Sequence, residues 1–256
     1  TSDASKMAFY LLHGLHLGIY GRLEEAINLL QRRVELSLET DEYLDAANTV
    51  HLARTYAVRA GHREKFESLS RQLLELMAEP NMPAESRQGL VTVNLTVGIL
   101  AKADAGDDEG AASMLARLEA TPESSFMFWP REMCLSMIEP RLLWAREDWT
   151  GLLAWYQENQ SDCDVLRELV IVAEAFAQTE GVASAMEVLS GPLPEECDAL
   201  PWYPMALSKL ASLQAEAGLF EDARETIARY DLLWPGPDSD LPAVIEVDRV
   251  RALIDP

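Results

Sequence analysis

The chain has 256 residues, of which 43 are acidic and 21 are Lys or Arg, so its formal net charge is −22. Hydrophobic residues make up 48% of it, which is enough for a sizeable core and excludes extensive disorder. Nucleic acids and anionic membrane surfaces attract proteins through clustered Lys and Arg. The acidic surplus therefore argues against both as partners.

The predicted elements are helices throughout the chain. Apolar residues recur at spacings of three and four among abundant Leu, Ala, Glu, Met and Arg, and strand-like alternation is nearly absent. Residues 5–38 predict two helices separated by a turn at Gly21. The positions that mark this hairpin are Tyr10, Gly14, Leu17, Gly21, Leu23 and Ala26.

The same arrangement recurs five more times, with turns 34 to 45 residues apart. The predicted turns are at Gly21, Gly61, Gly106, Glu147, Gly181 and Gly218, where Glu147 takes the place of glycine. The predicted hairpins are 5–38, 42–79, 84–120, 131–159, 163–190 and 203–233, followed by a capping helix over 241–254. Pro130 and Pro140 are predicted to flank a helix of the fourth hairpin.

Small residues stand at matching places around these turns. Gly14 and Ala211 lie seven residues before a turn, and Ala26, Ala111 and Ala223 lie five residues after one. Two antiparallel helices that cross closely need Gly or Ala where their backbones approach. A repeat of this length is typical of a helical solenoid, in which each hairpin buries its face against its neighbours.

The first hairpin resembles the tetratricopeptide repeat, and so does the sixth. The matching positions of the sixth are Leu207, Ala211, Gly218, Phe220 and Ala223, and the closing proline of the motif corresponds to Pro80, Pro122 and Pro235. The resemblance implies an all-α fold, a right-handed superhelical solenoid of about six antiparallel helix pairs plus the C-terminal capping helix. It implies one domain over residues 1–256.

The C-terminal segment is similar to the end of repeat regions that are appended to bacterial signalling proteins, including serine/threonine kinases and transcriptional activators. This similarity rests on Tyr230, Trp234 and the segments 237–238, 241–242 and 249–253. It implies a regulatory or interaction region whose catalytic or DNA-binding module lies upstream.

In tetratricopeptide arrays the first helix of each pair lines a concave groove. The groove positions carried over to this chain are His51, Thr55, Arg59, Thr96, Arg141, Trp144, Gln178, Ser208, Ser212 and Glu216. Leu11 and Leu15 stand where chaperone-binding members have Lys and Asn, which argues against a clamp for a terminal carboxylate.

No sequence motif for phosphate-loop, dinucleotide, zinc-protease or serine-hydrolase chemistry is present, so we predict no enzyme and no cofactor. His13 and His16 could share a metal, but their apolar surroundings favour a structural or interface role. The acidic run 104–109 could bind calcium, but acidic residues before a helix favour capping. The acidic segment 195–198 has the same interpretation.

The cysteines Cys134, Cys163 and Cys197 are odd in number and far apart, which indicates free thiols in a reducing compartment. Residues 1–5 lack a basic and an apolar region, so we expect no signal peptide and a cytoplasmic location. All six Trp residues lie in the second half of the chain, and residues 126–129 are bulky and outside the periodicity. That segment either covers the joint after the third hairpin or forms a docking patch.

We therefore predict a non-catalytic scaffold that binds a protein or peptide and regulates a larger bacterial signalling protein. The alternative is a small-molecule sensor with a closed apolar pocket around Trp144. Residues 1–128 contain 19 acidic and 12 basic residues, a net charge of −7, and residues 129–256 contain 24 and 9, a net charge of −15. A basic partner surface would complement this acidity.

Overall fold

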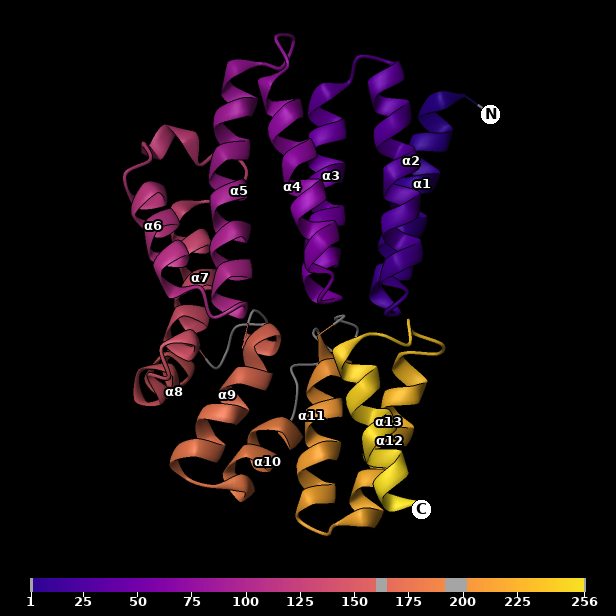
Figure 1. Ribbon diagram of the computed structural model, residues 1–256, viewed down its shortest axis with the longest axis vertical. Coiled ribbons are helices and arrows are strands. Elements are labelled where there is room, and N and C mark those ends of the chain that lie inside the picture. Colours follow the sequence, from indigo (N-terminus) through magenta and orange to yellow (C-terminus); the bar gives the residue numbers. More distant parts are fainter. Residues whose placement is uncertain (1, 160–164, 192–201, 256) are drawn as a thin grey trace. The chain divides into compact units, whose positions relative to one another are not determined.

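A computed structural model describes residues 2–159, 165–191 and 202–255. Within these ranges the regular structure is entirely helical, as predicted, and contains no strand (Figure 1). The sequence predicts one domain, and the chain divides into two compact units, Thr1–Ile138 and Glu139–Pro256. We call them the N-terminal unit and the C-terminal unit and describe each by itself.

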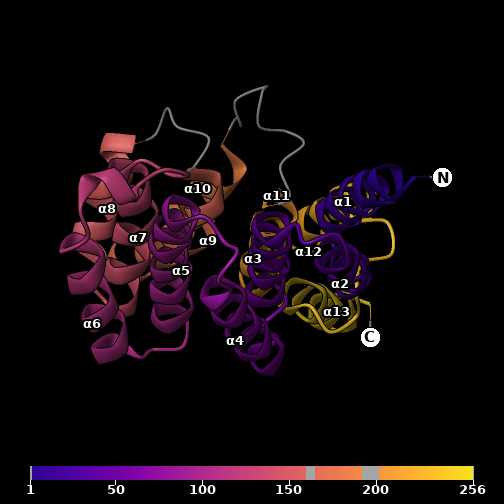
Figure 2. The same ribbon diagram turned by 90° about the horizontal axis from the view of Figure 1, so that it is seen from above.

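The N-terminal unit is a series of long helices in which consecutive members contact each other. Helices α3 and α4 form a hairpin, and both of them contact α5 (Figures 1 and 2). Its helices are α1 (Asp3–Ile19), α2 (Leu23–Glu39), α3 (Tyr43–Arg59), α4 (Arg63–Ala78), α5 (Ala84–Asp104) and α6 (Asp108–Glu119), followed by a 3-10 turn, η1 (Glu123–Ser125).

Helix α7 (Arg131–Ala145) spans the boundary between the two units. It begins after Pro130 as predicted, but Pro140 lies inside it, so the prediction that Pro140 flanks a helix is wrong. Proline removes one backbone donor from a helix. Here the helix continues beyond it, and the ring of Pro140 is buried.

The C-terminal unit continues with shorter helices. They are α8 (Trp149–Asn159), α9 (Val165–Thr179), α10 (Val182–Ser190), α11 (Tyr203–Glu216), α12 (Phe220–Leu233) and α13 (Pro242–Ile254). Helix α13 contacts both α11 and α12, and its stripe Val244, Val247, Val250 and Ile254 is buried. The predicted C-terminal helix is therefore confirmed.

All six predicted turn residues adopt the left-handed backbone conformation. Five are glycines with φ from +69° to +105°. The sixth is Glu147, which replaces glycine and has φ of +55°. Between α2 and α3 the chain turns at Asp41, with φ of +60°, which the sequence did not predict.

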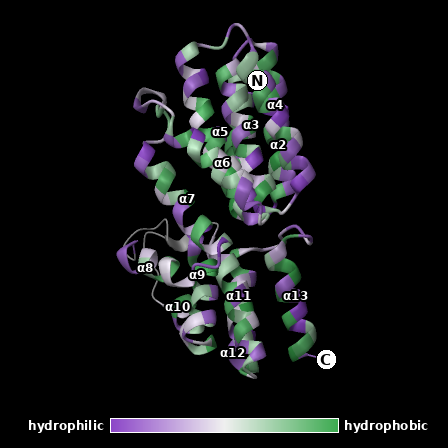
Figure 3. Cartoon of the chain, turned by 60° about the vertical axis from the view of Figure 1, so that its left-hand side comes forward, coloured by the Kyte–Doolittle hydropathy of each residue, from purple (hydrophilic) through white to green (hydrophobic). Residues whose placement is uncertain are grey.

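The small residues beside the turns lie where helices cross. Gly14 is buried, and a Cβ built on it would stand 3.2 Å from Leu30 Cγ, so a larger side chain would push α1 away from α2. Ala26, Ala111, Ala211 and Ala223 are all 0% exposed. Each helix carries hydrophilic and hydrophobic residues side by side (Figure 3), as expected of helices that bury one face.

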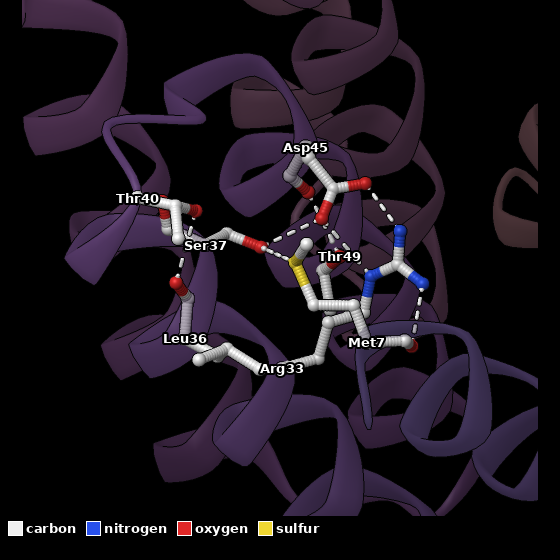
Figure 4. A network of polar contacts seen from close by, with 7 residues as sticks. All are labelled: Met7, Arg33, Leu36, Ser37, Thr40, Asp45 and Thr49. Carbon is white, nitrogen blue, oxygen red and sulfur yellow. Dashed lines mark hydrogen bonds and ion pairs between the residues drawn. The ribbon is translucent and has the colours of Figure 1, made fainter. Parts of the chain in front are cut away.

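A partly buried polar network joins the first three helices (Figure 4). Arg33 on α2 binds both carboxylate oxygens of Asp45 on α3, and its Nη1 donates to the carbonyl of Met7 on α1 at 3.0 Å. Ser37 donates to Asp45 Oδ2 at 2.6 Å. A two-pronged bond from guanidinium to carboxylate fixes geometry as well as adding energy. This network therefore sets how α1, α2 and α3 meet.

The same contacts determine the charge state of Asp45. Burial raises the pKa of its carboxyl, but the hydrogen bonds from Arg33 and Ser37 outweigh burial, and the net result is a pKa below the ordinary 3.8. A carboxyl whose pKa is lower in the folded chain stabilises the fold above its unfolded pKa. That contribution is lost as the pH falls through the folded pKa.

We predict that Asp45→Asn lowers the free energy of unfolding by about 1.5–3 kcal/mol at pH 7, because hydrogen bonds to charged groups contribute about that much. The difference from the wild type should begin to shrink below about pH 4, where Asp45 becomes protonated in the unfolded chain, and should shrink further as the pH falls through the lower pKa of the folded chain. Urea titrations at pH 7, 5 and 3 measure it, with the exposed Glu35→Gln as the control. A difference that stays constant down to pH 3 would contradict the role of the charge.

We predict opposite effects at two turns. Gly218 has φ of +76° and no atom within 4 Å of a built Cβ, so Gly218→Ala should cost about 1–2 kcal/mol through backbone strain alone. Glu147→Gly should stabilise the chain by up to about 1 kcal/mol, because it relieves the same strain. Gly191→Ala, at an ordinary φ of −57°, is the control and should be neutral within about 0.5 kcal/mol. Equal losses of stability in all three variants would contradict the assignment of backbone strain to the turns at Gly218 and Glu147.

Candidate ligand-binding cavity

A cavity of about 630 Å³ lies within the N-terminal unit, between the α3–α4 hairpin and helices α5 and α6. Small-molecule sites in proteins occupy about 300–1,000 Å³. The residues that characterise it are Arg54 on α3, Phe66 and Leu74 on α4, Asn94 and Gly98 on α5, and Met114 on α6.

About half of the residues that line the cavity are apolar or glycine. Leu74 is 53% exposed at the rim, whereas Ala57 is fully buried and Gly98 is also buried. A Cβ on Gly98 would overlap the methyl group of Met114, so the glycine makes room for that side chain. Met114 is flexible and adapts to irregular shapes. This wall can therefore adjust to a ligand.

Arg54 is the most unusual residue in the cavity lining, because it is charged and only 1% exposed. Its Nη1 donates to Asn94 Oδ1 at 2.5 Å, and its Nη2 donates to the Asn94 carbonyl at 3.4 Å. Its guanidinium carbon lies 5.0 Å from the centre of the Phe66 ring. The side chain thus crosses from α3 to α5 and stacks against α4.

No carboxylate of the described residues forms an ion pair with Arg54, and its buried Nε has no hydrogen-bond partner there. Burial lowers the pKa of Arg54 to about 10, so the guanidinium stays protonated at neutral pH. A buried charge is costly unless it is paired. Arg54 is thus an uncompensated positive charge at the cavity wall.

The C-terminal unit shows how the same chain compensates a buried charge. Glu168 on α9 is 1% exposed, and its carboxylate forms an ion pair with Arg141 Nε at 2.5 Å and with Arg167 Nε at 2.6 Å. Glu168 is buried with two ionic partners, whereas Arg54 is buried with none among the described residues. Arg54 therefore differs from the other buried charged residue.

The charged residues at the cavity rim are already paired. Arg63 Nε lies 3.1 Å from Glu67 Oε1, and Lys102 forms an ion pair with Asp107. Asp107 also accepts the Gly110 amide at 2.9 Å and so caps α6. Capping of α6 by the acidic run 104–109 is confirmed. No cluster of three potential metal ligands occurs among the residues that the structure describes.

The predicted groove residues of α3 are not among the described residues that line the cavity. His51 packs edge-to-face against Trp129, with ring centres 5.4 Å apart, and Thr55 donates to its carbonyl at 3.2 Å. Burial, assisted by the Arg54 charge, lowers the pKa of His51 to about 3, so this imidazole is neutral. Arg59 lies 5.7 Å from the Tyr56 ring centre.

The other predicted groove residues make contacts within their own units. Trp144 Nε1 donates to Glu174 Oε2 at 3.0 Å, and Arg249 binds both Ser212 and Glu216. Thr96 is fully buried and donates to the Thr92 carbonyl. Gln178 is exposed, and Ser208 is buried with its hydroxyl donated to the Met205 carbonyl.

None of the ten predicted groove residues is among the described residues that line the cavity. The sequence nevertheless contains a signal for it. Ala47, Val50, Arg54 and Ala57 share one stripe of α3, and all four are buried. An arginine within an otherwise apolar stripe predicts a buried cation. Arg54 was not predicted because only the groove-facing positions of the helices were considered.

The bulky segment 126–129 covers the joint between α3 and α5. Phe128 packs against Gly89 on α5, and Trp129 packs against His51 on α3. Met127 is 50% exposed. These contacts lie between the second and third predicted hairpins, so the segment covers a joint other than the one after the third hairpin.

Cys134 is a buried free thiol, as predicted, and burial raises its pKa. Cys163, Cys197 and the acidic segment 195–198 lie outside the described residues. No helix in the described part of the chain combines the length and apolar character needed to cross a membrane.

Comparison with models of protein families, with curated proteins and with solved structures gives no match to this chain. Neither the tetratricopeptide resemblance nor a function is therefore supported by a relative. Functional inference rests on the cavity and on the chemistry of its lining.

Proposed function

We propose that this chain is a non-catalytic binding module that senses a small molecule in the cavity of its N-terminal unit. We further propose that it is a cytoplasmic regulatory region of a larger bacterial signalling protein. Its architecture would be a tetratricopeptide-like, right-handed solenoid of about six antiparallel helix pairs with a capping helix. The six left-handed turns and the buried small residues support that architecture.

The cavity around Arg54 carries this proposal. It has the volume of a small-molecule site, partly apolar walls and a few convergent polar groups, which together are typical of ligand pockets. It lies around Arg54 and not around Trp144, whose indole is engaged by Glu174. The proposed ligand site therefore differs in place from the one expected from the sequence.

Binding is a more natural role for this lining than catalysis. The titratable groups that line the cavity besides Arg54 include the ion-paired Arg63, Glu67, Lys102 and Asp107 at the rim. No imidazole or thiol is among the described lining residues, and the Ser70 hydroxyl that lines the cavity donates to the Phe66 carbonyl at 2.7 Å and not to a base.

A second candidate function is the protein- or peptide-binding scaffold, and one observation favours it. Phe9 and Leu12 on α1 are 57% and 66% exposed, and Phe9 stacks on His13 at a ring-centre distance of 5.3 Å. Exposed apolar patches mark interaction surfaces. The net charge of −22 would favour a basic partner, whose binding should weaken as salt rises.

A thermal-shift screen of the full chain against a metabolite library tests the proposal. A ligand that binds only the folded state at 100 times its Kd adds about 2.7 kcal/mol of stability. We expect at least one such ligand, and its effect should vanish in the cavity-filling variant Ala101→Phe. The control Ala112→Phe, at an exposed position of α6, should retain it.

Other outcomes separate the two candidates. Peptide binding that is weakened by Phe9→Ser with Leu12→Ser, and is unaffected by Ala101→Phe, would favour the scaffold over the sensor. If neither metabolites nor an immobilised peptide library binds the folded chain, the proposal of a binding module is wrong.

A further inference from the structure

The starting observation is the uncompensated charge of Arg54. This side chain is 1% exposed, lines a cavity, and has an amide, a carbonyl and an aromatic ring as neighbours in place of a carboxylate. A guanidinium has five N–H donors. The two bonds to Asn94 leave most of that capacity unused.

We propose that the cavity is a binding site for a small organic molecule that has one carboxylate group and an apolar body. The carboxylate would neutralise Arg54, and the apolar body would fill the space toward Leu74 and Met114. This inference rests on the proposed function as a small-molecule sensor and names the class of its ligand.

The choice of a carboxylate follows from the donors at the base of the cavity. A guanidinium is planar and matches a carboxylate with two parallel hydrogen bonds. Asn94 adds a second donor, because its Nδ2 group has no partner among the described residues, while its Oδ1 faces Arg54. Arg54 and Asn94 therefore hold unused N–H groups from two helices beside one another, with the Arg54 side chain only 1% exposed.

The restriction to a single negative charge follows from the rim. Arg63 and Lys102 are the other cations in the lining, and each is already paired with an acidic neighbour. The lining also contains the carboxylate of Asp104, and of its three cations Arg54 is the one that forms no ion pair among the described residues. The net charge of −22 also repels polyanions, such as nucleic acids or acidic polypeptides, at long range.

The apolar body follows from the remaining wall. Ala57, Val58, Leu74, Ala101 and Met114 offer hydrocarbon surface, and Phe66 offers an aromatic ring. Removing apolar ligand surface from water contributes about 25 cal/mol per Å². A small inorganic anion would leave this surface unused, so we expect an amphipathic acid to bind better than acetate.

Matched probes test the inference on the full chain. Octanoate and 4-phenylbutyrate each have a primary amide of nearly the same shape and no charge. Isothermal titration at pH 7.5 should show at least one acid binding tenfold or more tightly than its amide, a difference of about 1.4 kcal/mol. Acetate should bind far more weakly than either acid.

Two arginine variants provide the matched comparison. Arg54→Met removes the charge at the cavity base and should weaken binding of the acid at least tenfold, while leaving the amide within twofold. Arg63→Met makes the same change at the exposed rim, where the guanidinium is paired with Glu67, and should leave both within twofold. Ala101→Phe should abolish binding of the acid.

The outcomes distinguish this inference from the function on which it rests. Equal binding of acid and amide, or unchanged acid binding in Arg54→Met, would overturn the carboxylate assignment. Failure of both acids at millimolar concentration would also overturn it. If a neutral metabolite then binds and Ala101→Phe abolishes that binding, the proposed sensor function survives.

A measurement on the wild type covers the case in which Arg54→Met fails to fold. The Nε–H signal of Arg54 in a ¹⁵N-labelled chain should shift on titration with octanoate, and that of Arg63 should not. Arg54→Lys, which keeps a charge but loses the planar fork, identifies the signal and should bind the acid more weakly than the wild type. An unshifted Arg54 signal at saturating acid would refute the contact.

Discussion

A buried guanidinium lies in the joint between the α3–α4 hairpin and α5, and the organisation of the N-terminal unit depends on how the apolar side chains around it fill that joint. A helical hairpin buries its apolar face only against its own partner helix and the next hairpin. Arg54 crosses this joint to Asn94 and stacks on Phe66 on the way. Side chains fill one part of this joint, and a cavity of about 630 Å³ remains in the part that they do not fill.

The charge on Arg54 gives this cavity its chemical character. An apolar cavity without it would favour any hydrocarbon of suitable shape. The guanidinium adds a preference for a negatively charged group next to Arg54. The cations at the rim add no such preference, because they are already paired with acidic residues. The contrast with Glu168, which is equally buried but bound by Arg141 and Arg167, shows that this fold can pair a buried charge. The lack of a carboxylate beside Arg54 among the described residues is therefore a reason to propose a negatively charged ligand.

The sequence predicted the helices and turns well because both are local properties. Glycine at Gly21, Gly61, Gly106, Gly181 and Gly218 favours positive φ, and the small residues near each turn mark helix crossings. The predicted hairpins 5–38 and 42–79 leave a break at Asp41, but its positive φ was not predicted because no glycine marks it. Pro140 was misread because the proline rule is a tendency that packing can override, as it does in α7.

The candidate site was much less predictable. A stripe of α3 that contains Arg54 indicates a buried arginine, but nothing in the sequence of α3 says which groups of α4 and α5 surround it. The contacts with Phe66 and Asn94 join residues 12 and 40 positions away, and they depend on the packing of three helices. The groove positions came from a family resemblance, and none of them is among the described residues that line the cavity.

The most direct test of the central claim is the free energy of unfolding of ligand-free Arg54→Met, measured in urea. If the buried charge is uncompensated without a ligand, this variant should be within about 1 kcal/mol of the wild type or more stable, because an apolar side chain of similar volume avoids the cost of a buried ion. Glu168→Met, which breaks a paired buried charge, should lose about 3–5 kcal/mol. A loss of that size in Arg54→Met would show that Arg54 is a structural element of the joint and would contradict its role as a ligand-binding charge.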